Sequence, residues 1–244
     1  MKKDNLIDIR NINFSFSDNP IITDFSYLLN ENEIVTIIGN SGCGKSTLLN
    51  LISGFLKPVS GDISVNGSLA FLTQYLTLLP YHSAYENALL ACELRNTKTE
   101  QKNKEANDLF ELFKLSEKSK NKFPQELSGG MQQRVGLIQT LLVDAQIYFL
   151  DEPLKEIDRA TGLIIQGYIW NKFKENHISS LIVTHDIEQA VLISDKILFL
   201  STNHPAEELV FDKDFVIIPP DKRLKTEEYN KYMLYVIKKL SELQ

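Results

Sequence analysis

The apolar and polar positions of this chain alternate in one stretch and run together in others, and both patterns predict strands. Residues 6–16 largely alternate between apolar and polar side chains, as in a strand with one buried face. Later stretches are continuous apolar runs, typical of strands buried on both faces of a mostly parallel sheet. They are residues 33–38, 146–150, 180–184 and 197–200. Weaker signals predict a strand at 27–30, a hairpin at 61–67, a strand at 69–72 and a late strand or hairpin at 210–218.

Helical patterns separate these strands. A glycine-rich turn at 39–44 precedes a predicted helix at 45–53, and the chain turns helical from about residue 83 to residue 144. Ser83 with Glu86 has the spacing of a capping box at a helix start, as does Thr97 with Glu100. Residues 226–243 predict an amphipathic helix with an apolar stripe of Tyr229, Met233, Val236, Ile237, Leu240 and Leu243. We expect one α/β domain over residues 1–244, with a helical subdomain at 83–144 and a C-terminal tail at 205–244.

Composition narrows the class of protein. Hydrophobic residues make up 43% of the 244 residues and charged residues 24%, near the averages for a globular domain. The formal net charge of −6 argues against a protein that holds nucleic acid mainly through phosphate contacts. The apolar runs are far shorter than the roughly 20 residues of a membrane-spanning helix, and no apolar signal core follows the N-terminus. Cys43 and Cys92 cannot form a disulfide framework, so we expect free thiols in the cytosol.

The turn at 39–44 carries a phosphate-binding motif. Residues 39–47 fit the pattern of a glycine, four variable residues, Gly-Lys and Ser or Thr, between a strand and a helix. The glycines let backbone N–H groups surround phosphate oxygens, and the helix directs its positive end toward them. Lys45 can reach the β- and γ-phosphates, and Ser46 can bind Mg²⁺. The candidate residues are Gly39, Asn40, Ser41, Gly42, Cys43, Gly44, Lys45, Ser46 and Thr47.

Two further stretches fit a nucleotide site. The strand at 146–150 delivers Asp151 to the carboxyl edge of the sheet, where it can bind the metal. Glu152 follows as the candidate base for an attacking water. Ser128 is a good helix N-cap, and Gly129 and Gly130 allow a close approach to an anion.

With these motifs in this order, residues 6–205 resemble the ATP-binding subunit of ABC transporters. The family fold is a P-loop NTPase core with a mostly parallel sheet, an antiparallel β part and a helical subdomain. Phe16 matches an adenine-stacking aromatic residue, and Gln74 matches a glutamine that touches metal and water. His185 matches the histidine at the γ-phosphate, and Asp158 matches a loop that faces the other subunit. The resemblance thus implies Glu152, His185 and Gln74 as catalytic residues, and Ser46, Gln74 and Asp151 as metal ligands.

The resemblance also implies cofactors and partners. ATP and Mg²⁺ would bind in a head-to-tail homodimer, each ATP lying between the phosphate loop of one ATPase subunit and Ser128–Gly130 of the other. Transmembrane permease subunits and an extracytoplasmic solute-binding protein would complete the system, and no nucleic acid takes part. This chain would lie peripherally at the cytoplasmic face of the cell membrane.

A short stretch narrows the subgroup. Leu78-Leu79-Pro80, followed by Glu86 and Asn87, is similar to ATPases of nitrate, sulfonate and taurine importers, although Tyr81 replaces that group's usual tryptophan. The expected function is ATP hydrolysis that powers import of a small solute of this kind. The alternatives are an ABC ATPase of another importer or exporter, a soluble ABC ATPase of DNA repair or translation, and a module that uses ATP only to dimerise.

The chain departs from the family pattern at three places. Met131 replaces a frequent glutamine, Thr73 replaces a common aromatic residue, and residues 155–158 replace a loop of small residues. The last departure bears on communication between the two ATP sites. Because Cys43 lies inside the phosphate loop, we also expect a thiol reagent to block ATP binding and ATP to protect against it.

Overall fold

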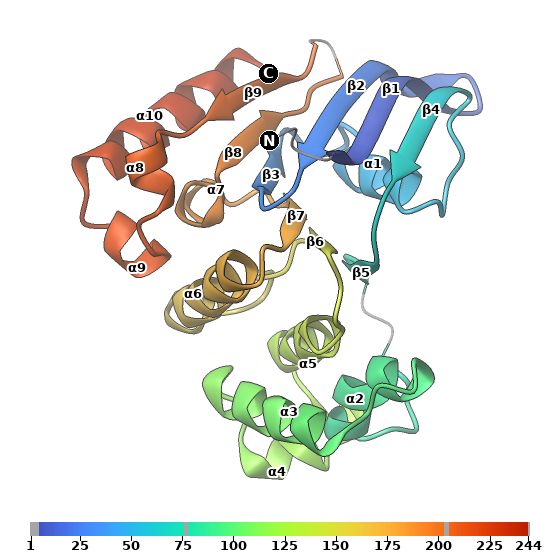
Figure 1. Ribbon diagram of the computed structural model, residues 1–244, viewed down its shortest axis with the longest axis vertical. Helices are drawn as coiled ribbons and strands as arrows, with labels where there is room; N and C mark the ends of the chain where they lie inside the picture. Colours follow the sequence, from blue (N-terminus) through green and yellow to red (C-terminus); the bar gives the residue numbers. More distant parts are fainter. Residues whose placement is uncertain (1–4, 76–77, 203–204, 244) are drawn as a thin grey trace.

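The computed structural model describes residues 5–75, 78–202 and 205–243, and its centre is a six-stranded sheet (Figure 1). The strand order is β5-β6-β7-β3-β8-β9, and all neighbours run parallel except β8 and β9. Every residue of β3, β6 and β7 is buried, so the apolar runs correctly predict the interior of a parallel sheet. The strands are β3 (Ile34–Ile38), β5 (Leu69–Leu72), β6 (Ile147–Asp151), β7 (Ser179–Val183), β8 (Lys196–Phe199) and β9 (Glu207–Val210).

An antiparallel sheet of order β2-β1-β4 lies at the upper right of Figure 1. The strand predicted at 27–30 is the end of a longer β2, and the hairpin predicted at 61–67 is wrong, because β4 is one strand paired with β1. Gly61 lies so close to β1 that a Cβ there would be 2.5 Å from the carbonyl oxygen of Arg10. The strands are β1 (Asn5–Phe16), β2 (Asn19–Asn30) and β4 (Ser60–Val65).

Helices α1, α6 and α7 flank the central sheet, and α2 to α5 gather below it in Figure 1. The capping box predicted at Ser83 and Glu86 is confirmed, whereas α3 takes Thr99 rather than Thr97 as its N-cap. One cluster of buried apolar side chains joins α2, α3 and α5 to α6. The helices are α1 (Lys45–Ile52), α2 (Ala84–Leu94), α3 (Glu100–Leu112), α4 (Glu117–Lys120), α5 (Gly129–Leu141), α6 (Arg159–Glu175) and α7 (Ile187–Ile193).

The tail packs against β8 and α7, on the face of the central sheet opposite α1. The predicted late strand at 210–218 is wrong beyond Val210, because Asp212 starts helix α8 there. The predicted terminal helix exists, but its buried stripe includes Tyr232, which the sequence analysis missed, and leaves Ile237 48% exposed. The tail helices are α8 (Lys213–Val216), α9 (Pro220–Arg223) and α10 (Glu227–Glu242).

Over the three described ranges, no helix combines the length and the hydropathy needed to span a bilayer.

Candidate functional site

The phosphate loop leaves buried strand β3 and enters α1 through two glycines with left-handed backbone. Gly42 and Gly44 have φ values of +82° and +98°, which residues with side chains adopt only under strain. A Cβ at Gly44 would also lie 2.9 Å from Cγ2 of Ile21. The first N–H groups of a helix have no partner within it, so those of α1 face the loop. The loop therefore offers an anion site at the positive end of α1.

Lys45 adds a positive charge to this loop. Its Nζ donates hydrogen bonds to the carbonyl oxygens of Gly39 at 2.8 Å and Asn40 at 2.9 Å. These bonds hold the ammonium group over the loop, where Lys45 lines the cavity described below.

Cys43 lies beneath the loop rather than in the cavity. Its side chain is only 3% exposed and packs in the apolar cluster under α1. Burial raises the pKa of the Cys43 thiol, although the nearby Lys45 charge acts in the opposite direction. Because the thiolate is the reactive form, the expectation of a readily modified Cys43 is revised: the folded chain should react slowly.

Asp151 supplies a buried carboxylate at the carboxyl end of β6. Its Oδ1 is buried and has no hydrogen-bond partner among the residues that the structure describes. Burial raises the pKa of Asp151, and a hydrogen bond with Ser46 acts in the opposite direction. A carboxylate oxygen without a partner beside a serine hydroxyl is a donor set of the kind that Mg²⁺ prefers. Ser46 and Asp151 therefore fit the predicted metal, and Gln74 lines the same cavity.

Glu152 and His185 form a pair across the ends of β6 and β7. The Nδ1 atom of His185 lies 2.9 Å from each carboxylate oxygen of Glu152. Glu152 has a left-handed φ of +51°, and its N–H donates to the carbonyl oxygen of Val183 at 2.8 Å. This strained conformation turns the Glu152 side chain toward the histidine. The Glu152 side chain is mostly buried, whereas that of His185 is 71% exposed.

A cavity of about 450 Å³ brings these groups together. Phe16 lies at its wall and is 54% exposed, whereas its neighbour Phe14 is buried in the core, so Phe16 is available for stacking. Gly39, Asn40 and Cys43 belong to the loop without lining the cavity. The predicted residues that line it are Phe16, Ser41, Gly42, Gly44, Lys45, Ser46, Thr47, Gln74, Asp151, Glu152 and His185.

Sequence reasoning missed the apolar lining residues Ile21 and Val183 and two polar residues of this site. The amide of Gln133 on α5 donates to the carbonyl oxygens of Glu152 at 3.0 Å and Pro153 at 3.3 Å. It therefore fixes the backbone that carries the candidate base. Lys155 lines the cavity, although the sequence analysis treated it only as a departure from the family pattern. The glutamine-rich start of α5 was a signal for Gln133, but its partner was visible only in the fold.

Ser128, Gly129, Gly130 and Asp158 do not line the cavity. The hydroxyl of Ser128 accepts the N–H of Met131 at 3.4 Å and so caps α5. Asp158 caps α6 in the same way, and the N–H of Thr161 lowers the pKa of its carboxyl group.

The surface at the start of α5 is covered within the chain by Glu156. A Cβ at Gly129 would collide with Oε2 of Glu156, and one at Gly130 would collide with its carbonyl oxygen. The structure therefore places an acidic residue of the unusual loop at 155–158 against this pair of glycines.

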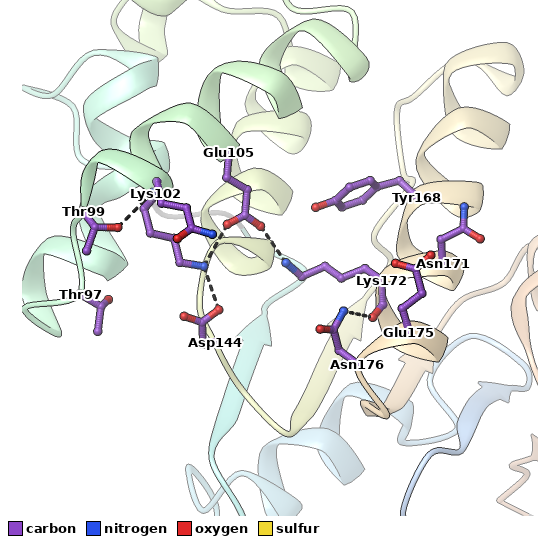
Figure 2. Close-up of a pocket in the computed structure, with 11 residues that line it drawn as sticks. Thr97, Thr99, Lys102, Glu105, Asp144, Tyr168, Asn171, Lys172, Glu175 and Asn176 are labelled. Atoms are coloured by element: carbon purple, nitrogen blue, oxygen red, sulfur yellow. Dashed lines mark hydrogen bonds and ion pairs between the residues drawn. The ribbon is translucent and has the colours of Figure 1, made fainter.

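A larger crevice of about 850 Å³ lies between α3 and α6 (Figure 2). Glu105 at its centre binds Lys102 at 3.0 Å and Lys172 at 2.8 Å, and Lys102 also binds Asp144 at 2.8 Å. These charges satisfy one another, whereas Asp151 in the smaller cavity has an oxygen that no described residue hydrogen-bonds. The geometry therefore favours the smaller cavity as the nucleotide site.

Comparison with known proteins identifies the family. Residues 22–155, more than half of the 244-residue chain, match the family model described as ABC transporter. The chain belongs to the ABC transporter family. The predicted family is therefore confirmed.

Relatives within the ABC transporter family include import proteins. The chain is 33% identical to the formylaminopyrimidine import ATP-binding protein ThiZ of Halalkalibacterium halodurans, over 93% of this chain and 90% of the relative. It is 34% identical to the nitrate import ATP-binding protein NrtD of Synechococcus elongatus, over 79% of this chain and 75% of the relative. Other relatives are longer: the chain spans 57% of the length of a spermidine/putrescine import ATP-binding protein.

A solved ABC structure shares the fold. It is a dimeric, post-hydrolysis state of an ATP-binding cassette bound to ADP and Pi, and it superposes with a TM-score of 0.75 at 25% identity. The match covers 84% of this chain and 99% of that one. The predicted α/β fold of an ABC ATPase is thus confirmed.

Proposed function

We propose that this chain binds ATP with Mg²⁺ and hydrolyses ATP as the ATPase subunit of an ABC importer for a small solute. The observation that carries the proposal is the cavity that joins Lys45, Asp151 and the Glu152–His185 pair. A phosphate cradle, a metal ligand and a candidate base within one cavity are the parts that phosphoryl transfer to water requires.

The phosphate loop binds and orients the nucleotide. Backbone N–H groups at the start of α1 donate to phosphate oxygens, and Lys45 moves from the loop carbonyls to the β- and γ-phosphates. Phe16 offers an exposed ring on which the adenine can stack. The chain thus holds both ends of ATP through residues on β1 and α1.

Ser46 and Asp151 would hold the metal, with Gln74 as the third candidate ligand. Mg²⁺, when bound, neutralises the charge that develops on the phosphate oxygens. Asp151 is suited to this role because its buried oxygen, which has no partner among the described residues, would be stabilised by a cation.

Glu152 orients the attacking water and accepts its proton. His185 binds the Glu152 carboxylate through Nδ1 and leaves its other ring nitrogen on the solvent side, because the ring is mostly exposed. We infer that, in the doubly protonated form of His185, this second nitrogen donates to the γ-phosphate. Gln133 keeps the Glu152 backbone in the strained conformation that this geometry needs.

A second copy of the chain completes each site. Ser128–Gly130 start the positive end of α5 but lie outside the cavity that holds the other groups. In a head-to-tail homodimer, these residues would close over the nucleotide of the partner. The dimeric form of the solved ATP-binding cassette supports this arrangement.

A groove between β5, α2, α5 and the segment that follows α1 is suited to docking a permease. It has a volume of about 290 Å³, and Phe55, Phe71 and Ala91 are among its apolar lining residues. Leu94, 75% exposed, extends the apolar surface next to it. Docking here would place the chain at the cytoplasmic face of the membrane, with the helical subdomain at 83–144 on one side of the permease contact.

The importer would also need an extracytoplasmic solute-binding protein. The import proteins for nitrate and formylaminopyrimidine among the relatives support a small solute, which includes the nitrate, sulfonate and taurine class.

The test is ATP turnover of the wild type against Glu152→Gln. Loss of the base should lower kcat by about 10²-fold or more, because general base catalysis contributes 10²–10⁴-fold. Glu111→Gln, an exposed acid on α3, is the matched control and should turn over like the wild type. Equal turnover of the wild type and Glu152→Gln would refute ATP hydrolysis at this site.

A second experiment tests the transport role. A co-expressed multi-spanning permease should co-purify with the wild type and with Glu111→Gln, but not with Leu94→Glu, which places a charge beside the groove. Equal recovery of the permease with Leu94→Glu would contradict docking at this groove.

A further inference from the structure

The tail is anchored to α7, the helix that begins just after His185. Arg223 is fully buried, and its Nη1 donates to the carbonyl oxygens of Leu192 at 2.8 Å and Ser194 at 2.9 Å. The guanidinium group also lies 4.8 Å from the ring centre of Phe215. A cation at the carboxyl end of a helix satisfies carbonyl groups that lack a partner within the helix. Arg223 therefore fixes the tail to the far end of α7.

A second contact joins α10 to the near end of α7. The hydroxyl of Tyr229 donates to Oε1 of Glu188 at 3.3 Å, and Arg159 donates to Oε2 of the same carboxylate at 2.9 Å. Arg159 directly follows Asp158, the N-cap of α6. Glu188 thus joins the tail to the segment after His185 and to the loop that ends at Asp158.

The third contact reaches the phosphate loop itself. Nδ2 of Asn40 donates to the carbonyl oxygen of Leu243 at 3.2 Å, where α10 ends. The side chain of Leu243 is buried in one cluster with Ile38, the last residue of β3 before the loop. The backbone oxygen of Asn40 is one of the two carbonyl acceptors of Lys45. A tail helix is therefore hydrogen-bonded to the residue that precedes the phosphate cradle.

We propose that the C-terminal tail is a positioning element of the nucleotide site, and that the Asn40–Leu243 hydrogen bond sets the start of the phosphate loop. This inference rests on the proposed function. Asn40 acts here through its side chain, on the side of the loop that does not line the cavity. The buried Arg223 holds the tail in place against α7, and the bond from Asn40 to Leu243 carries that position to the phosphate loop.

The test is a double-mutant cycle on the dissociation constant for ATP, measured by titration calorimetry. Its variants are Asn40→Ala, a chain that ends at Glu242, and the two combined. Each single change should raise the Kd by about two- to tenfold, which corresponds to the net loss of one hydrogen bond. The combination should raise the Kd no further than either single change, because both remove the same bond.

Two controls separate the anchor from general loosening of the tail. Leu243→Ala keeps the carbonyl group and should bind ATP like the wild type, with a lower Tm. Tyr229→Phe removes the contact with Glu188 but leaves the loop anchor, so it should also keep the wild-type Kd. An equal loss of affinity in Tyr229→Phe and in the shortened chain would overturn the proposal. So would a combined variant whose Kd rises by the product of the two single increases.

Thermal unfolding without nucleotide shows whether the shortened chain is folded. If it is not, Asn40→Ala is compared with Asn40→Gln, which keeps the amide donor. Recovery of affinity in Asn40→Gln supports the anchor, and an equal loss in both variants overturns it. A wild-type chain that does not bind ATP would instead refute the proposed function, whatever the variants do.

Discussion

Helix α1 begins after a glycine-rich turn and helix α5 begins with two glycines of its own, but their first turns face different surroundings. The start of α1 faces a cavity that also contains Asp151, Glu152 and His185. The start of α5, at Gly129, lies outside that cavity and contacts Glu156 of its own chain. The two helix ends are chemically similar, since both offer backbone N–H groups and a positive dipole end to an anion.

The difference supports the proposed homodimer, in which α1 binds the nucleotide of its own chain and α5 closes over the nucleotide of the partner. The start of α1 shares one cavity with Asp151, Glu152 and His185, whereas Glu156 is the described residue that lies against Gly129 and Gly130 at the start of α5. Gln133, one turn along α5, nevertheless holds the backbone of Glu152. In our account, α5 therefore connects the catalytic base of its own chain with the nucleotide of the partner.

The strongest test of this comparison is Ser128→Arg. A bulky side chain at the start of α5 should block closure over the partner's nucleotide and lower kcat by about 10²-fold, whereas ATP should bind the separate chain with nearly the wild-type Kd. Steady-state turnover and calorimetry measure the two quantities. Loss of the Ser128 N-cap should also lower the free energy of unfolding by about 1 kcal/mol.

Thr99→Arg is the matched control, because Thr99 caps α3 just as Ser128 caps α5. It should destabilise the fold by a similar amount without slowing turnover. If Ser128→Arg turned over ATP as fast as Thr99→Arg, the start of α5 would have no part in catalysis.

A smaller effect is expected for Gln133→Leu. The carbonyl oxygens of Glu152 and Pro153 would lose their donor, so the base would be less well oriented and kcat should fall by about tenfold, equivalent to about 1.4 kcal/mol. KM should hardly change, because the phosphate loop is untouched. Gln132→Leu removes hydrogen bonds to Pro124 and Leu127 instead. A KM effect in Gln133→Leu, or an equal kcat loss in both variants, would contradict a positioning role.

The smallest effect concerns the crevice in Figure 2. Lys172→Met removes one of the two lysines that bind Glu105. Because partly exposed ion pairs contribute little, the free energy of unfolding should fall by about 0.5–1 kcal/mol and turnover should stay within about twofold of wild type. Chemical denaturation measures the free energy of unfolding of Lys172→Met and of the control Lys118→Met, which changes an exposed lysine of α4. A large loss of turnover in Lys172→Met alone would make this crevice part of the catalytic machinery.

The sequence predicts the central sheet and the cavity well because each depends on a local signal. The buried apolar runs are short and bounded by polar turns, as is typical of interior strands, and the phosphate loop is a fixed spacing of glycines and lysine. The hairpin at 61–67 fails because the partner of β4 is β1, a pairing about 50 residues distant in sequence. No local pattern contains such a pairing.

Side-chain contacts between distant segments are what the sequence does not reveal. Gln133 and Arg223 look like ordinary helix residues, yet one holds the backbone of Glu152 and the other caps α7. Cys43 looks accessible because it lies within the phosphate loop, but the fold turns its side chain into the core. Burial and long-range hydrogen bonds decide these roles, and both arise only when the chain has folded.

The central claim is that two copies of the chain complete each nucleotide site, and light scattering on Glu152→Gln tests it most directly. With ATP and Mg²⁺, this variant should bind nucleotide without hydrolysing it and show twice the 27.9 kDa mass of one chain. Adding Ser128→Arg should return the mass to 27.9 kDa while ATP stays bound. A mass of one chain for Glu152→Gln at saturating ATP would contradict the account.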